Sequence, residues 1–252
     1  MLDSLSVPLP PGKLVTGEGD DKPAMWVSDG PAPAGLWPTL RAAHATSGLW
    51  PLLLDALGDD DGSTRPWDDG EFSPSDASDP AAFDPAALLA TGWDDNTSPD
   101  GDSDDLAPYG SGWPGLAPAI RFGDPARTAD DAATEWLRMR PARRLGLIPA
   151  GRPADAVTTI GWTGAINYVA DSAQLSAVLR SWEDRFGAVL IGAGFAELHL
   201  SVPTPPTSAA AARPLAAEHF AFCPDQVYQG AGSLKTYAGQ LVNAPIWSFW
   251  WD

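Results

Sequence analysis

The sequence predicts a single α+β domain, in which helices pack on a mixed or largely antiparallel sheet and a long acidic loop is inserted. Segments with the period of a helix alternate with strand-like segments, and two strands within 189–202 are close enough to form a hairpin. The acidic residues are concentrated in one stretch. We therefore divide the domain into an N-terminal part, 1–54, an acidic Pro/Gly-rich insertion with one short helix, 55–125, and a C-terminal part, 126–252.

The N-terminal part is expected to contribute two strands and a helix. Residues 1–24 are rich in proline and glycine and predict an irregular lead-in to a short edge strand at 25–27. A helix is expected at 37–47 and a strand at 49–54. Because Pro51 lacks the N–H that a β-ladder requires, we expect the second strand to lie at an edge or to contain a bulge.

The negative charge of the protein is concentrated in the insertion. Between Asp55 and Asp105 the chain holds 16 of its 33 acidic residues and one of its 15 basic residues, so this segment carries −15 of the net charge of −18. Low hydrophobicity combined with high charge predicts a solvated, mobile segment. Within it, 80–90 is expected to be helical, and Trp67 and Trp93 are expected to pin the segment to the core.

The composition excludes several classes of function. The basic residues are too few for a surface that follows nucleic-acid phosphates. No run approaches the ~20 apolar residues that cross a bilayer, and the first residues lack the pattern of a signal peptide. The single cysteine allows no internal disulfide, which fits a reducing compartment. We expect a cytoplasmic protein that binds neither nucleic acid nor membrane.

The C-terminal part shows the most regular periodicity. A helix at 129–140, a strand at 145–149 and a short helix at 155–162 come first. The next helix begins at Asp171 or Ser172, both good N-cap residues, and Gly187 suits its C-terminal cap. Its apolar face consists of Leu175, Val178, Leu179, Trp182 and Phe186.

A hairpin and two further helices follow. Strands at 189–192 and 198–202 are joined by a turn at Gly194. The next helix is expected at 207–223, but a proline inside a helix costs ~3 kcal/mol. We therefore expect this helix to start near Arg213, with Pro214 in its first turn.

The end of the chain is expected to form a helix and a strand. The last helix begins after Ser233 and ends near Asn243. Residues 246–251 carry large aromatic rings at both alternating positions, so we expect this strand to be internal to the sheet and covered on both faces.

Four motifs of this part stand out together. They are Trp182-Glu183-Asp184-Arg185-Phe186-Gly187, Ala217-Glu218-His219-Phe220-Ala221-Phe222-Cys223-Pro224-Asp225, Gln229-Gly230 and Trp247-Ser248-Phe249-Trp250-Trp251-Asp252. Joined in this order, they resemble the C-terminal domain of a bacterial family of unknown function, domain of unknown function 4253. The resemblance covers roughly the last third of the chain, and it implies a cytoplasmic protein of actinobacterial type without any assigned activity.

The candidate ligand-binding residues lie in the same part of the chain. His219 and Cys223 are four residues apart on a helix, a spacing that suits a metal ion or an activated thiolate. Burial in an apolar stripe explains the pair more simply, and His199 is the third candidate. Aromatic faces bind sugars, bases and cations, although core packing also explains them. This adds Trp247, Trp250 and Trp251.

Other motifs fail on inspection. Asp100, Asp102 and Asp104 have the spacing of a calcium loop, but the required glycine and bidentate glutamate are absent. Gly192-Ala193-Gly194 begins a dinucleotide fingerprint, yet a strand follows where a helix is needed. We therefore expect no metal, no cofactor and no catalytic residue.

The sequence thus favours a non-enzymatic protein-binding domain, immunity-like or regulatory, with a basic protein as its partner. The acidic insertion would speed the encounter with such a partner at low salt. The alternative is a small-molecule-binding or enzymatic domain with a pocket near His219, Cys223 and the C-terminal tryptophans. A deep pocket with convergent polar groups beside these residues would favour this alternative.

Overall fold

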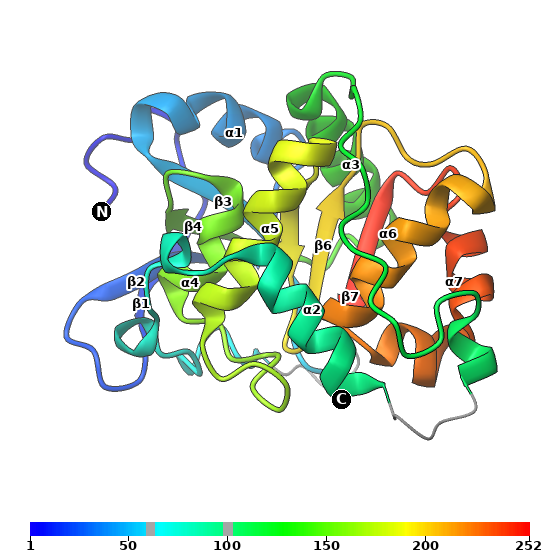
Figure 1. The fold of residues 1–252 in the computed structure, drawn as a ribbon. Helices are drawn as coiled ribbons and strands as arrows, with labels where there is room; N and C mark the ends of the chain where they lie inside the picture. Colours follow the sequence, from blue (N-terminus) through cyan, green and yellow to red (C-terminus); the bar gives the residue numbers. More distant parts are fainter. Residues whose placement is uncertain (59–63, 98–102) are drawn as a thin grey trace.

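The computed structural model describes residues 1–58, 64–97 and 103–252 of the chain, which form a mixed seven-stranded sheet with helices on both faces (Figure 1). The strand order is β1-β2-β4-β3-β5-β6-β7. Neighbouring strands are antiparallel, apart from β3 and β5, which are parallel. The predicted α+β fold with a mixed sheet is confirmed.

The elements have the following bounds. The strands are β1 Gly12–Thr16, β2 Pro23–Pro31, β3 Leu49–Leu54, β4 Arg144–Pro149, β5 Val189–Ala193, β6 Glu197–Ser201 and β7 Ile246–Trp250. The α-helices are α1 Leu36–Ser47, α2 Pro85–Asn96, α3 Pro125–Met139, α4 Ala156–Ile160, α5 Ser172–Phe186, α6 Ala209–Phe222 and α7 Leu234–Gln240.

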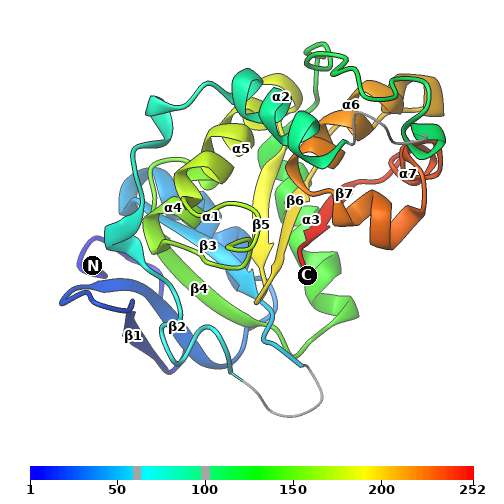
Figure 2. The ribbon, with the colours of Figure 1, turned by 60° about the horizontal axis from the view of Figure 1, so that its bottom comes forward.

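The helices form two layers that sandwich the sheet (Figure 2). Helices α1 and α3 pack on one face, where α3 crosses β5 and β6. Helices α4, α5 and α6 cover the other face, and α2 lies across α5 and α6 as an outer layer. Successive side chains of β7 point to opposite faces of the sheet, as in any β-strand. Trp247 and Phe249 pack against Trp182 of α5, whereas Ser248 pairs with His199 on the α3 face.

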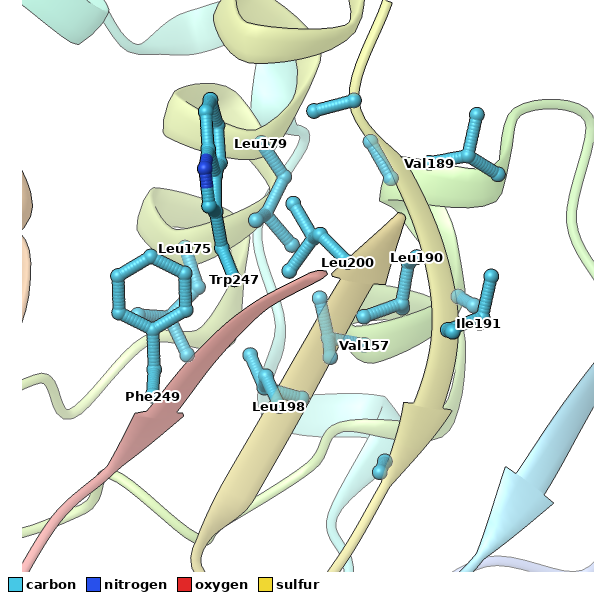
Figure 3. Packing of buried hydrophobic residues seen from close by; sticks show 14 of the residues in the cluster. Val157, Leu175, Leu179, Val189, Leu190, Ile191, Leu198, Leu200, Trp247 and Phe249 are labelled. Atoms are coloured by element: carbon cyan, nitrogen blue, oxygen red, sulfur yellow. The ribbon is translucent and has the colours of Figure 1, made fainter. Parts of the chain in front are cut away.

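Helix α5 is the central element of the core, and the sequence predicts it correctly (Figure 3). The side chain of Asp171 accepts a hydrogen bond from the N–H of Ala173, and Gly187 ends the helix in the left-handed conformation, with φ of 65°. Leu175 and Leu179 of α5 point toward the buried leucines of β5 and β6. Trp182 is fully buried and stacks on Phe249 with a centroid distance of 5.3 Å.

Two expectations about the N-terminal part are wrong. Residues 1–24 contain the edge strand β1, and β2 lies inside the sheet between β1 and β4. Pro51 lies in a central strand, because β4 and β5 flank β3. The parallel ladder to β5 involves Leu53 and Leu54, so the missing N–H of Pro51 falls outside that ladder. The carbonyl of Pro51 accepts a hydrogen bond of 3.1 Å from Trp37 Nε1.

The part of the acidic segment that the structure describes is anchored more firmly than a solvated loop would be. Trp67 and Trp93 are fully buried, as expected for pins, but Phe72 is also buried and bridges to Trp162. The predicted helix is displaced to Pro85–Asn96. Gly92 lies inside this helix at the point where α2 crosses α6, since a Cβ atom there would overlap the carbonyl of Ala221. The aspartates of the rejected calcium loop at 100 and 102 lie outside the described residues.

Two expectations about the C-terminal part are also wrong. Helix α6 begins after Ser208, whose side chain accepts from the N–H of Ala211, so Pro214 lies inside the helix. Strand β7 is an edge strand paired with β6 alone among the strands of the described chain, and its Ser248 is exposed. Helix α6 continues through Pro214 because side chains on both sides of the proline, such as Ala212 and Leu215, are buried in the core. The buried aromatic face of β7 holds this strand at the edge. None of the helices in the described residues has the length and apolar composition of a membrane span.

Candidate functional site

His219 lies in the core, enclosed by aromatic rings. Its side chain is fully buried on α6, and its ring centroid lies 4.6 Å from that of Trp247 and 4.8 Å from that of Phe249. His219 Nδ1 and the hydroxyl of Tyr237 share a hydrogen bond of 3.0 Å. Burial, reinforced by the nearby charge of Arg185, lowers the pKa of His219 to about 3. The imidazole is therefore neutral at physiological pH, and its position is that of a core residue.

Cys223 follows α6 and is also buried. Its thiol donates a hydrogen bond of 2.9 Å to the carbonyl of Trp250, and burial raises the pKa of the thiol to about 12. A nucleophilic cysteine needs a lowered pKa, because the thiolate is the reactive species. The environment of Cys223 raises the pKa of its thiol instead. His219 and Cys223 are therefore packed as core residues and not as a reactive pair.

The three candidate tryptophans of the C-terminal strand divide between two environments. Trp247 and Trp251 are buried on the α5–α6 side, with 2% and 4% of their surface exposed. Trp250 is half-buried and lines a pocket on the opposite face. The structure therefore does not bring the six candidate residues together. It separates His199 and Trp250 from the other four.

His199 and Trp250 line a polar pocket of about 460 Å³ between the end of α3 and the strands β6 and β7. The register of the two strands builds its floor, because His199 lies opposite Ser248 and Glu197 lies opposite Trp250. His199 Nδ1 and Ser248 Oγ share a hydrogen bond of 2.9 Å. Asp55, at the end of β3, and Arg140 and Arg143, after α3, complete the wall.

One wall of the pocket consists of three side chains in contact: Trp136 of α3, Arg143 shortly after this helix, and His199 of β6. The Arg143 guanidinium lies 3.5 Å from the ring centroid of Trp136, and the His199 ring lies 4.2 Å from Trp136. Arg143 is also held by an ion pair of 2.9 Å with Asp55 and donates to the carbonyl of Trp136 at 2.9 Å. Such a buried, doubly held arginine fixes the orientation of the indole.

Gly192 makes this stack possible. Trp136 lies directly over β5, and a Cβ atom at residue 192 would overlap its ring and come within 2.8 Å of the carbonyl of Leu53. Gly192, the first glycine of the incomplete dinucleotide fingerprint, thus has a packing role. The sequence gives no indication that Trp136 contacts Gly192, except that Gly192 interrupts an otherwise apolar buried strand, and such a glycine often marks a close approach.

The electrostatics of the pocket favour binding over proton transfer. His199 keeps part of its surface accessible, but dense packing and then the charges of Arg143 and Arg140 lower its pKa to about 3. An efficient general base has a pKa near the working pH, so His199 is a poor base for Ser248. A neutral imidazole beside a hydroxyl is nevertheless a good pair of hydrogen-bonding groups for a ligand. Within the described residues, acidic, histidine and cysteine side chains form no cluster of three that could hold a metal ion.

The comparisons with known proteins agree with the motifs in the C-terminal part. A family model described as Domain of unknown function (DUF4253) matches residues 144–252, which is less than half of the chain. No curated protein and no solved structure matches the chain significantly. The matched region supplies β4 to β7, including His199, Ser248 and Trp250, whereas Asp55 and Trp136 come from outside it. The pocket is therefore built by both parts of the chain.

Proposed function

We propose that this protein binds a small polar molecule that contains a ring, such as a monosaccharide or a nucleoside, in the pocket between α3 and the β6–β7 edge. The observation that carries this proposal is the convergence of His199, Ser248 and Trp250 in one pocket of about 460 Å³. Binding pockets for small molecules have volumes of roughly 300–1,000 Å³ and combine aromatic walls with a few polar groups.

Each lining group has a role in this proposal. Trp250 offers a partly exposed aromatic surface on which a sugar or base ring can stack. The hydroxyl of Ser248 and the imidazole of His199 hydrogen-bond to the polar edge of the ligand. The stack of Arg143 and Trp136 keeps the wall rigid, so the ligand meets a site that is already formed.

A binding screen tests the proposal. Monosaccharides, nucleosides and amino acids are screened by ligand-observed NMR, and the affinity of each binder is then measured by titration. We expect Trp250→Ala to weaken the binding of a sugar or nucleoside by about tenfold or more, because it removes the stacking surface. Trp113→Ala is the matched control, since Trp113 is also half-buried but lies outside the pocket. Failure of every sugar and nucleoside to bind, or equal losses in the two variants, would contradict the proposal.

A second candidate function is binding of a basic protein, and the distribution of charge favours it. The segment between Asp55 and Asp105 carries −15, and Asp69, Asp76, Asp94 and Asp104 are among its exposed residues. A field of this kind accelerates encounter with a positively charged surface and is screened by salt. We expect a pull-down at low salt to retain a basic partner that is lost at high salt. Absence of a salt-sensitive partner would rule out this candidate.

A further inference from the structure

A second cavity lies between α2 and the loop 167–169 that precedes α5, on the other side of the sheet from the polar pocket. It has a volume of about 450 Å³. Helix α2 forms its outer wall, because this helix lies across α5 and α6 (Figure 1). The floor of the cavity is apolar, and polar side chains gather where α2 ends. The floor includes Leu88, Leu89, Leu175, Val178 and Phe222, and the polar residues are Asp95, Asn96, Asn167 and Tyr168.

The charged groups that line this cavity all have the same sign. Among the described residues of its lining, Asp84 and Asp95 are acidic, and none is lysine, arginine or histidine. Asp84 caps α2 by accepting a hydrogen bond of 3.0 Å from the N–H of Ala86. The side chain of Asp95 forms neither a hydrogen bond nor an ion pair with the part of the chain that the structure describes. Asp95 lies in the last turn of α2, where the helix dipole also favours a positive charge.

Tyr168 connects this end of the cavity to a buried carboxylate. Its hydroxyl donates a hydrogen bond of 2.9 Å to Asp225, which is 3% exposed. Asp225 also accepts from the side-chain amide of Gln229 at 2.8 Å and from the N–H of Asp252 at 3.0 Å. These donors are neutral, and no lysine or arginine of the described chain pairs with Asp225. Partial burial and then Asp225 raise the pKa of Tyr168 to about 12. The surroundings of Tyr168 are therefore negative.

The other groups at this end also suit a cation. The ring of Tyr168 lines the cavity and is 41% exposed, and aromatic rings attract cations. The amide nitrogen of Asn96 donates to the carbonyl of Gly92 at 2.7 Å, and that of Asn167 donates to the carbonyl of Asp252 at 3.2 Å. The oxygens of the two amides remain as acceptors, which an ammonium group requires.

From these observations we propose that the cavity binds a primary amine attached to an apolar ring system. The ammonium group lies at the end formed by Asp95 and Tyr168, and the rings lie on the apolar floor. An anionic ligand would meet carboxylates without a compensating positive charge, which is unfavourable. The volume lies within the range for ligand sites (roughly 300–1,000 Å³) and suits a compound of one or two rings. This cavity shares no lining residue with the polar pocket, so each proposal can fail without the other.

Three indole probes that differ only in their end group test the proposal on the full chain. Tryptamine carries an ammonium group, tryptophol a hydroxyl and indole-3-propionate a carboxylate on the same ethyl chain. Ligand-observed NMR titrations at pH 7 and low salt give the dissociation constants. We expect tryptamine to bind about threefold to tenfold more tightly than tryptophol, and indole-3-propionate to bind most weakly. Added salt should reduce the advantage of tryptamine, because it screens the carboxylates.

Two pairs of variants locate the binding site. Asp95→Asn removes a negative charge, so it should remove most of the preference for tryptamine while tryptophol still binds. Asp94→Asn is its matched control, because Asp94 is also exposed in the last turn of α2 but lies outside the cavity. Ala87→Leu should fill the cavity and weaken the binding of all three probes. Ala81→Leu is its matched control, since Ala81 is also an exposed alanine but does not line the cavity.

The outcomes that overturn the proposal are equally specific. These are equal affinities of the parent protein for tryptamine and tryptophol, equal effects of Asp94→Asn and Asp95→Asn, and unchanged tryptamine binding in Ala87→Leu. Trp250→Ala distinguishes the two pockets, because it changes the polar pocket alone. Loss of tryptamine binding in Trp250→Ala but not in Ala87→Leu would assign the amine to the polar pocket and overturn the proposal.

Discussion

The two faces of the β6–β7 edge are built from alternating residues of the same two strands, yet they have opposite properties. On the α5–α6 face, Trp247 and Phe249 are sealed in the core together with His219. On the α3 face, His199 and Ser248 line a polar pocket. Both histidines have a lowered pKa, but the His219 ring is fully buried whereas His199 remains partly accessible.

This difference shows that residue type alone does not distinguish a site from a core. A histidine and large aromatic rings occur on each face. What differs is the helix that covers the strands, since α5 and α6 close over one face, while α3 ends at Met139 and leaves part of the other face open.

Replacing the tryptophans of β7 tests the comparison most directly. Trp247→Ala should destabilise the protein by about 3–5 kcal/mol, the usual cost of removing a large buried ring. Trp250→Ala should cost only about 1 kcal/mol, because this ring is half-buried. Urea unfolding of both variants measures the difference. Similar losses of stability would show that the α3 face is as closely packed as the other.

The support of the pocket can be disturbed at Gly192. Gly192→Ala places a methyl group against Trp136 and should destabilise the protein by up to about 3 kcal/mol through overpacking. The NMR signals of His199 should shift as Trp136 moves. Gly151→Ala is the control, because a Cβ atom there meets no neighbour within 4 Å. A Gly192→Ala variant with parental stability and unchanged His199 signals would contradict the role assigned to this glycine.

The sealed histidine predicts a specific dependence of stability on pH. His219 has a pKa of about 3 when folded against an ordinary value of 6.5, so between these values the unfolded chain binds the proton and the folded protein does not. Stability is therefore fully present above the unfolded pKa and decreases as the pH falls toward the folded pKa. At pH 5 the loss due to His219 is about 2 kcal/mol.

Urea unfolding at pH 7 and pH 5 measures this contribution. His219→Leu should be less stable than the parent at pH 7, because it removes the partner of Tyr237, but it should lose about 2 kcal/mol less on acidification. His199→Leu should also lose about 2 kcal/mol less on acidification, because the pKa of His199 is likewise lowered to about 3. A much smaller reduction in His199→Leu than in His219→Leu would contradict this pKa and show that solvent reaches the α3 face more freely.

Much of the local structure could be predicted from the sequence because short-range chemistry determines it. Helix α5 begins after Asp171 and ends at Gly187, as the cap residues indicate. The alternation in 198–202 and 246–251 gives the strands β6 and β7 and the separation of their faces. His199, Trp250 and the other candidate residues were recognised by chemical type, but not by which of them share a site.

The tertiary structure alone decided the order of the strands and the position of the pocket. Pro51 indicated an edge strand, but the limited ladder between β3 and β5 accommodates it at the centre of the sheet. The pocket depends on Trp136 lying over Gly192 and on Arg143 pairing with Asp55, contacts between residues far apart in the chain. Periodicity and capping report only neighbours along the chain. The contacts that seal one face of β7 and leave the other open form only when distant segments pack together.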